Sequence, residues 1–584
     1  MGLDIEVTGG DKMEEEYDVI VVGAGFGGPV AAKKCADAGL KTLMLERAEV
    51  PGEKVISGCS IPIYGFVCGP AFIRDGNPPI ERPLACVSND IIKDIEAGDI
   101  DIDDSMRFPK PLSPIFTVGY NTYCKPFCEW EAKKAVEAGA ELRTSTVAVD
   151  PIKEDGYIKG IVTDKGKKIR SKILIDAEGS QGLLAIKAGV REKYPPEVIS
   201  LADTYVYDMP KEDIDRIFGH SNRFGWGWDE QKIAPPLGHG NGFMLFPYRD
   251  SLHFMQDQCL RTDHGQVPDL KRLLAEYHKN LTTKLPWWKE DVAPRVKLRA
   301  RMWDGAEIFL GLDERRRNMP NYTDGMILIG DVAGLEGAAL LDGVPCAWFS
   351  ADIAADVAIE ALKANDTSRS FLKRYDDRIK AHGIIQWSIT NPNRYNLRYA
   401  QESHDEKLLK KTVHNFFGLG IGTELGTGLL KTILPSIKDD PAIIGKWIKM
   451  FFRYYYNWQH ERYDYHMGHE HAHESIKLPK VGGAVFRTIS WIRDSLLQFF
   501  GPLIIRTILR TVDSLLQFFA PLIRSVARFL EPVSIFANPL LKIFLPIYEG
   551  LLKIIEPIID PLTDPLSKKM VGFVERADPS IFEV

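Results

Sequence analysis

The stretch YDVIVVGAGFGGPVAAKKCADAGLKTLMLER at residues 17–47 decides how the rest of the chain is interpreted. It begins with an apolar, β-branched run at 19–22, which predicts a buried strand. Three glycines in G-x-G-x-x-G spacing follow, and an Ala-rich helix pattern comes after them. A second apolar strand is expected at 42–45. Strand, glycine turn, helix and strand together predict a βαβ unit.

Each glycine of this unit, and the acid that closes it, has a physical role in binding a dinucleotide. Gly23 permits the tight turn, Gly25 lets a pyrophosphate approach the backbone, and Gly28 lets the helix pack closely on the strand. The helix N-terminus offers N–H groups to the phosphates. Glu46 is placed to accept hydrogen bonds from ribose hydroxyls. The alternative is a Gly-rich turn without a ligand, and the complete set of elements favours the dinucleotide site.

Length, charge and cysteine usage limit the classes of protein that the chain can belong to. Its 584 residues allow two to four domains. The net charge of −7 gives no support for binding nucleic acid. The eight cysteines are scattered and none forms C-x-x-C, so we expect a reducing compartment and no iron–sulfur cluster on this chain. The acidic start at 1–16 lacks the apolar core of a signal peptide.

The remaining pattern predicts alternating elements. In order, we expect a turn-rich loop at 51–60, an irregular excursion at 70–118, a helix at 126–138, a strand at 141–149, a hairpin at 156–176, a strand-rich aromatic segment at 190–300, a strand at 326–329 and a helix at 347–363.

Three motifs carry a resemblance to a known family. The N-terminal glycine motif, Glu178-Gly179 and Gly330-Asp331 occur in this order in flavoproteins of the p-hydroxybenzoate hydroxylase superfamily. Within it, PGEKVISG at 51–58, AVEAGAEL at 135–142 and GDVAGLEGAALLDGV at 330–344 most resemble the FixC group. This group comprises relatives of electron-transfer-flavoprotein:quinone oxidoreductase, and geranylgeranyl reductases are close cousins.

The resemblance implies an α/β (α+β) chain. It would have a Rossmann-like FAD-binding domain interrupted by a β-sheet substrate domain, followed by an α-helical amphipathic C-terminal region. Asp331 would accept hydrogen bonds from the ribityl chain or pyrophosphate edge of FAD. Gly343 would approach the flavin pyrimidine at the positive end of the following helix. The full set of expected FAD-binding residues is Gly23, Gly25, Phe26, Gly28, Glu46, Arg47, Lys54, Ser57, Gly58, Lys125, Val147, Glu178, Gly179, Gly330, Asp331, Gly343 and Val344.

The chain departs from the family pattern at three places. Lys125 stands in for an arginine that helps bind the pyrophosphate, as a point charge instead of a bidentate fork. Glu178 stands where the family has aspartate. Cys59 stands where many relatives have glycine, in a loop expected to face the flavin. It is either a redox-active or flavin-tuning thiol or a small buried residue, and no catalytic side chain is assigned.

Each of two further stretches can be interpreted either as a structural segment or as a binding site. The Gly-rich segment at 418–428 is interpreted as a flexible interhelical or membrane-facing loop, because no strand precedes it and no acid follows. With no second nucleotide site, electron delivery by a protein is favoured over NAD(P)H. His466, His469, His471 and His473 are weak candidates for a metal site, and a solvated linker is the preferred interpretation.

The C-terminal tail at 481–567 predicts attachment to a membrane surface. DSLLQFF occurs twice with a nineteen-residue offset, and prolines divide the tail into short pieces. No uncharged run is long enough to span a bilayer. Arginines at helical intervals predict amphipathic helices that lie in one leaflet of an anionic membrane. A helical dimerisation or packing domain is the alternative. The aromatic cluster between 447 and 458 is interpreted as an interfacial belt.

These observations predict a peripheral, monotopic flavoprotein on the cytoplasmic side of the cell membrane. It would take electrons from electron-transfer flavoprotein, through a ferredoxin-like iron–sulfur subunit, and reduce a membrane quinone such as menaquinone. One alternative is a geranylgeranyl-reductase-like enzyme that saturates prenyl double bonds. A second alternative is a membrane scaffold with a vestigial flavin fold.

The expected domain organisation follows from these assignments. The segments are an N-terminal extension (1–16), the FAD-binding domain in three parts (17–85, 119–189 and 301–375), an excursion (86–118), a quinone-covering sheet (190–300), a helical region (376–464), a His-rich linker (465–480), the membrane-binding helices (481–567) and a C-terminal tail (568–584).

Overall fold

The structure is a computed structural model of the whole chain. It describes residues 15–53, 58–94, 99–105, 117–193, 199–227, 242–259, 270–308, 319–335, 343–390, 403, 405–417, 424–460 and 520–521. Lys54, Ser57, the four histidines at 466–473 and nearly all of the tail at 481–567 lie outside the described residues, so the predictions made for them remain predictions.

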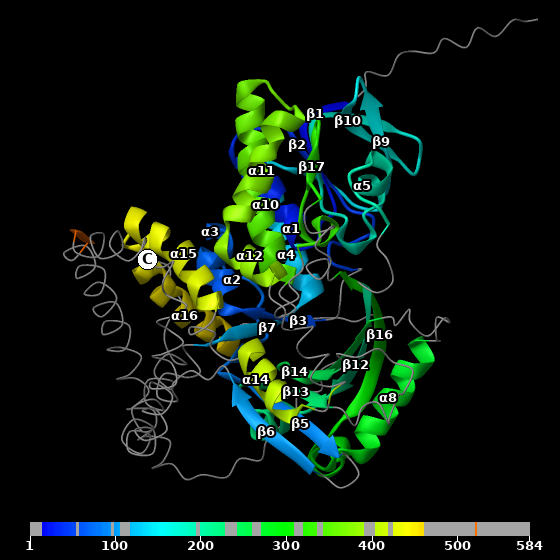
Figure 1. Cartoon of the computed structure of the whole chain (residues 1–584), viewed down its shortest axis with the longest axis vertical. Coiled ribbons are helices and arrows are strands. Elements are labelled where there is room, and N and C mark those ends of the chain that lie inside the picture. Colours follow the sequence, from blue (N-terminus) through cyan, green and yellow to red (C-terminus); the bar gives the residue numbers. More distant parts are fainter. Residues whose placement is uncertain are drawn as a thin grey trace, which may run out of the picture.

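An eight-stranded sheet contains the predicted βαβ unit (Figure 1). Its parallel core has the order β8-β2-β1-β11-β18, and an antiparallel extension comes from β9, β10 and β17. The strands are β1 (Glu15–Val22), β2 (Thr42–Leu45), β8 (Glu141–Arg143), β9 (Ala148–Glu154), β10 (Tyr157–Thr163), β11 (Lys168–Asp176), β17 (Tyr322–Thr323) and β18 (Met326–Leu328). Parallel strands place their carboxyl ends at one edge, where ligands bind in open α/β sheets.

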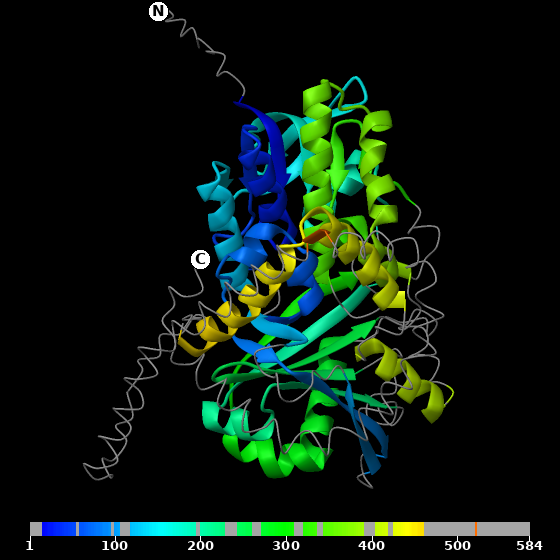
Figure 2. The same cartoon turned by 90° about the vertical axis from the view of Figure 1, so that its left-hand side faces the viewer.

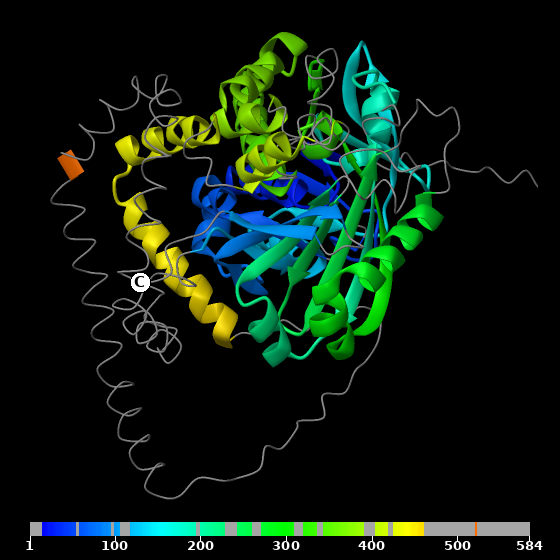
Figure 3. The ribbon, with the colours of Figure 1, turned by 60° about the horizontal axis from the view of Figure 1, so that its bottom comes forward.

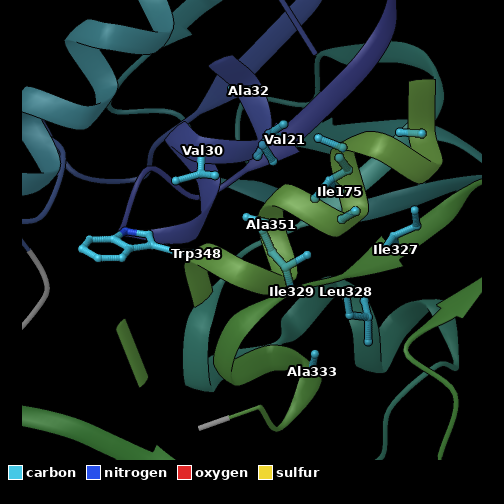
Figure 4. Close-up of a cluster of buried hydrophobic side chains, with 14 of the residues drawn as sticks. Val21, Val30, Ala32, Ile175, Ile327, Leu328, Ile329, Ala333, Trp348 and Ala351 are labelled. Carbon is cyan, nitrogen blue, oxygen red and sulfur yellow. The ribbon is translucent and has the colours of Figure 1, made fainter. Parts of the chain in front are cut away.

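The core of this domain forms because the central strands are apolar on both faces and helices cover them. In β1, Val19, Ile20 and Val21 are fully buried. The helices α1 (Gly27–Asp37) and α10 (Gly343–Ala364) pack against each other and against the sheet. Figure 4 shows Trp348 and Ala351 of α10 with the side chains of α1 and the central strands. Burial of continuous apolar strands under helices is the usual arrangement of a parallel sheet.

A seven-stranded sheet lies beyond the carboxyl edge of the first sheet (Figure 1), with α8 (Leu270–Lys284) across its outer face (Figure 3). It is antiparallel except for the β13–β5 pair. In spatial order its strands are β16 (Lys297–Ile308), β12 (Ile199–Asp208), β15 (Ser251–Cys259), β14 (Gly242–Pro247), β13 (Ser221–Gly227), β5 (Cys86–Asp94) and β6 (Asp99–Ser105).

Residues 86–94 and 99–105 are therefore not part of the irregular excursion predicted at 86–118, because they form β5 and β6. Isoleucines and aspartates alternate in β6, which forms the edge of the second sheet. Charged side chains on an edge strand keep other chains from pairing with it, so a low intrinsic β propensity is tolerated there. At the opposite edge, β16 extends to Ile308, so the second sheet includes residues 301–308, which the sequence places in the FAD-binding domain.

The predicted strand at 141–149 is also divided. β8 pairs with β2, whereas β9 pairs with β10, and Ser145 between them has a positive φ of 48°. This left-handed residue turns the chain between the two strands. The hairpin at 156–176 and the strand at 326–329 are confirmed within a residue or two. The helix expected at 347–363 begins earlier, at Gly343, because Pro345 is compatible with a first helical turn.

A small third sheet and several helices join the two large sheets. The third sheet consists of β3 (Gly58–Pro62), β7 (Gly119–Tyr123) and β4 (Arg82–Leu84). The other helices are α2 (Ile63–Cys68), α3 (Ala71–Asp75), α4 (Cys124–Glu137), α5 (Leu183–Ala188), α6 (Lys211–Ile217), α11 (Arg369–Ala381), α12 (Gly383–Thr390), α14 (Glu406–Phe417), α15 (Glu424–Asp439) and α16 (Ile443–His460). α4 confirms the helix predicted at 126–138.

The C-terminal helices α15 and α16 contradict two interpretations of the sequence. Residues 424–428 of the Gly-rich stretch are the start of α15, not a loop. α16 packs against the body of the protein (Figure 2), where Tyr454, Tyr455 and Trp458 are buried. The Tyr454 hydroxyl donates to the Ile73 carbonyl oxygen. These aromatic side chains therefore hold the helix in place and do not form an interfacial belt.

Candidate functional site

The glycine turn after β1 opens one end of a cavity. A Cβ atom on Gly23 would lie 2.3 Å from the Ala177 carbonyl oxygen, and one on Gly28 would lie 1.8 Å from the Gly23 carbonyl oxygen. Both positions therefore require glycine for packing. At Gly25 no atom lies within 4 Å of a Cβ position, and this residue lines the cavity. The turn thus has the division of roles that a pyrophosphate-binding turn needs.

Glu46 is held at the end of β2 by two backbone donors. Its Oε2 accepts from the Ala24 N–H at 2.9 Å and its Oε1 accepts from the Ala48 N–H at 2.8 Å. Each carboxylate oxygen has a further lone pair for a ligand hydroxyl. The neighbouring Arg47 is exposed and donates from Nη1 to Gln181 Oε1 at 2.7 Å. Glu46, Arg47 and Gln181 all line the cavity.

The two later motifs meet at the same edge of the sheet. A Cβ atom on Gly179 would lie 3.8 Å from Asp331 Oδ2, although about 150 residues separate them. Burial raises the pKa of Asp331 to about 6. Glu178 accepts from the Leu184 N–H at 2.7 Å, and burial raises its pKa as well. Carboxyl groups removed from water in this way are strong hydrogen-bond acceptors for ligand hydroxyls when ionised.

The N-terminus of α10 and the strand β3 both contribute to the cavity wall. Gly343, Val344 and Ala347 line the cavity from the first turns of this helix of 22 residues. A helix carries a partial positive charge at its N-terminus. From β3, Gly58 and Cys59 also line the cavity. The first turns of α10 therefore favour negative charge in the part of the cavity that they line.

The cavity has a volume of about 410 Å³ and two chemically different ends. The first end lies at the carboxyl edge of the parallel strands and is lined by the turns and carboxylates described above. The second end lies under the seven-stranded sheet, and we call it the apolar chamber. Its lining residues are Leu84, Val87, Val118, Ala202, Asn222, Phe224, Met244, Phe246 and Met255. A cavity of this size with few polar groups is typical of a ligand site.

Most of the residues predicted for the site line this one cavity. They are Gly23, Gly25, Phe26, Glu46, Arg47, Gly58, Val147, Glu178, Gly179, Gly330, Asp331, Gly343 and Val344, together with Cys59. Gly28 lies beneath the turn, and Lys125 does not line the cavity, whereas its neighbour Cys124 does.

Sequence reasoning missed the residues of the apolar chamber, apart from its general prediction of an aromatic covering sheet. Apart from Val118, which directly precedes β7, they come from six strands and share no local motif, so only their alternation along β13 and β14 could have indicated them. It also missed Gln181, at the end of a short 3-10 helix (Gly179–Gln181), and Thr146, in the connection between β8 and β9.

Comparison with known proteins agrees with this geometry. Residues 18–200 match the FAD dependent oxidoreductase family. A digeranylgeranylglycerophospholipid reductase of Methanocaldococcus jannaschii is 28% identical over 378 residues, which cover 63% of this chain and 83% of the relative. Protein FixC of Bradyrhizobium diazoefficiens is 26% identical over 435 residues, which cover 69% of this chain and 91% of FixC.

The chain is an FAD-dependent oxidoreductase. Its kinship with FixC proteins and geranylgeranyl reductases confirms the resemblance found in the sequence. A geranylgeranyl bacteriochlorophyll reductase-like protein of Thermoplasma acidophilum shares the fold, with a TM-score of 0.54 at 21% identity. That match covers 75% of this chain and all of the neighbour.

The described residues fit FAD on three observations. Gly25 leaves open space at the turn, and no side chain caps the N-terminus of α1, so its N–H groups can donate to a pyrophosphate. Glu46 and Asp331 are acceptors at two places on the cavity wall. The N-terminus of α10 can stabilise negative charge on a reduced flavin. When bound, FAD accepts electrons from one partner and passes them to another.

No helix in the described part of the chain is long and apolar enough to cross a membrane. No group of three or more His, Cys, Asp or Glu side chains in the same part of the chain is arranged to hold a metal ion.

Proposed function

We propose that this FAD-dependent oxidoreductase passes electrons from electron-transfer flavoprotein, through a ferredoxin-like iron–sulfur subunit, to a membrane quinone such as menaquinone. The observation that carries the proposal is the continuity of the cavity: the end that fits FAD opens directly into the apolar chamber. A lipid-soluble acceptor in the chamber would lie beside the cofactor. The similarity to FixC over 91% of that protein supports this choice of reaction.

The residues of the chain have distinct tasks in this reaction. The glycine turn and the α1 N-terminus would bind the pyrophosphate, and Glu46 and Asp331 would orient the cofactor through its hydroxyl groups. The first turn of α10 would stabilise negative charge on the flavin. Phe224, Phe246 and the methionines of the chamber exclude water and pack against an apolar ring. The chain thus positions both reactants and leaves the electron chemistry to FAD.

We further propose that the protein works as a peripheral, monotopic protein on the cytoplasmic side of the cell membrane. The arginines of the repeated amphipathic sequence at 481–567 support this location, because anionic head groups attract them. A quinone would then enter the apolar chamber from the lipid phase, and the donor proteins would approach from the water.

Reduction of prenyl double bonds is a second candidate function. It is favoured by the 28% identity to a digeranylgeranylglycerophospholipid reductase and by the same apolar chamber, which also suits a hydrocarbon chain. The two reactions differ in the acceptor and not in the cofactor.

An anaerobic turnover experiment distinguishes the two functions. The full chain, reduced chemically, is mixed with a short-chain menaquinone analogue or with a digeranylgeranyl lipid, and flavin reoxidation is followed by absorbance. The proposal predicts rapid reoxidation by the quinone, with hydroquinone as the product. Reoxidation by the prenyl lipid alone, with saturated product in the lipid fraction, would establish the second candidate. A colourless protein after incubation with excess FAD would favour a vestigial fold.

A further inference from the structure

One polar side chain faces the apolar chamber from the seven-stranded sheet. The residues of this sheet that line the cavity are Val87, Ala202, Asn222, Phe224, Met244, Phe246 and Met255. Among them, Asn222 alone carries a hydrogen-bonding side chain. A single polar group in an otherwise apolar pocket commonly fixes the orientation of a ligand.

The alternation of β13 directs the Asn222 side chain toward the chamber. Asn222 and Phe224 are two residues apart, so they share one face of the strand, and both line the cavity. Arg223 points to the opposite face, where its guanidinium lies 3.9 Å from the centre of the Trp287 ring and pairs with Asp90. The amide of Asn222 is therefore on the ligand side of the sheet.

Asn222 is held in place by one partner across the sheet junction. Its Oδ1 accepts from Asn121 Nδ2 at 2.8 Å, and its Nδ2 donates to Asn121 Oδ1 at 3.3 Å. Asn121, on β7, also donates from Nδ2 to the Pro247 carbonyl oxygen at 2.9 Å. A primary amide has two N–H donors. The second N–H of Asn222 has no acceptor among the residues that the structure describes, so it is available to a ligand.

We propose that Asn222 donates this N–H to a carbonyl oxygen of a quinone ring bound in the apolar chamber. The inference rests on the proposed function and names the residue that selects its substrate class. A quinone carries two carbonyl acceptors, whereas a prenyl double bond carries none. A hydrocarbon ligand would leave this N–H, on a side chain that is fully buried, without an acceptor, which is unfavourable. Asn222 therefore makes the chamber prefer a quinone to a hydrocarbon.

Two matched variants test the assignment. Asn222→Leu and Asn121→Leu break the same Asn–Asn pair and each leave one amide without that partner, but only Asn222→Leu removes the amide from the chamber wall. We expect Asn222→Leu to raise the KM for a short-chain menaquinone analogue about 10- to 100-fold. Asn121→Leu should change it less than about threefold. Flavin content should stay at the wild-type level in both variants, and Asn121→Leu should also keep the wild-type rate of ferricyanide reduction.

A comparison on the wild-type protein keeps the test independent of folding. Menadione and 2-methylnaphthalene share a methylated two-ring skeleton, and only menadione has carbonyl groups. We expect 2-methylnaphthalene to inhibit reduction of the quinone analogue only weakly. Its inhibition constant should be at least about tenfold higher than the KM for menadione. Equal affinity for the two rings would overturn it.

The outcomes separate this inference from the proposed function. Equal KM increases in the two leucine variants, or an unchanged KM in Asn222→Leu, would overturn the role of Asn222 while quinone reduction by the wild type stands. A wild-type protein that reduces prenyl lipid and ferricyanide but no quinone would overturn both.

Discussion

At the scale of single residues, two glycines of the turn are needed for different reasons: Gly28 for folding and Gly25 for binding the cofactor. A Cβ atom fits at Gly25 but not at Gly28, where it would lie 1.8 Å from a carbonyl oxygen. We predict that Gly25→Val leaves the free energy of unfolding within about 0.5 kcal/mol of wild type and loses FAD. Gly28→Ala should lower the free energy of unfolding by about 1–3 kcal/mol.

The measurement for this pair is flavin absorbance per polypeptide together with thermal unfolding. The expected pattern is a stable, colourless Gly25→Val protein and a destabilised Gly28→Ala protein. If Gly25→Val bound FAD as tightly as wild type, the cavity at the turn would not be the pyrophosphate site.

A buried carboxyl at the junction of the sheets predicts a pH dependence. Glu81 is almost fully buried, 3.8 Å from Arg249, and burial raises its pKa to about 8. The ordinary glutamate pKa is about 4.3, so between these values the folded state binds more protons than the unfolded state. Its contribution to the free energy of unfolding is therefore largest at acid pH and falls as the pH rises through 8.

The variant Glu81→Gln should remove this dependence, because glutamine stays neutral. We predict melting temperatures equal to wild type at pH 5 and higher than wild type at pH 9, measured by differential scanning fluorimetry across that range. Parallel curves for the two proteins would show that Glu81 titrates normally.

Much of the nucleotide-binding end could be predicted from the sequence at this scale. Gly23, Gly25 and Glu46 belong to one local motif whose spacing requires a particular backbone. The apolar chamber could not be predicted in the same way. Phe224, Met255 and Ala202 become neighbours only through strand pairings, and no spacing in the sequence encodes which strands are adjacent.

At the scale of elements, the local sequence pattern predicted the strands of the parallel core and the hairpin. For β6 and α16 it gave the wrong prediction, because their structure depends on contacts with distant parts of the chain. β6 has an aspartate-rich sequence of low β propensity, yet it forms a strand because it can pair at a sheet edge. The aromatic residues of α16 resemble a membrane belt in the sequence. Three of them, Tyr454, Tyr455 and Trp458, are buried instead, because α16 packs against α3 and β4.

The packing of α16 predicts which of its residues stabilise the fold. Trp458 is 4% exposed, and its ring lies 5.0 Å from that of His220. Trp458→Ala should lower the free energy of unfolding by about 3–5 kcal/mol. Lys446→Ala on the same helix removes an exposed ion pair with Asp440, which lies just before the helix, and should change it by less than about 1 kcal/mol. Chemical denaturation gives the free energy of unfolding of both variants. Equal decreases in the two would mean that α16 is not docked as described.

At the scale of the whole molecule, two sheets enclose one cavity, and the tail follows the last helix that the structure describes as packed on them. A chain that ends at Lys480 keeps α16 and every cavity residue. We therefore predict that it retains FAD and ferricyanide reduction but no longer binds vesicles containing anionic lipid. Co-sedimentation of the full and shortened chains provides the measurement. Undiminished sedimentation of the shortened chain would refute membrane attachment through residues 481–567.

The central claim is that FAD and a lipid-soluble acceptor occupy the two ends of one cavity. Ala202 lies on the wall of the apolar chamber and is 2% exposed, so Ala202→Phe would fill the chamber without touching the glycine turn. The decisive measurement is the rate at which a menaquinone analogue reoxidises the reduced flavin of this variant. We expect a fall of at least about tenfold with unchanged flavin content and unchanged ferricyanide reduction. A wild-type rate with the quinone would contradict it.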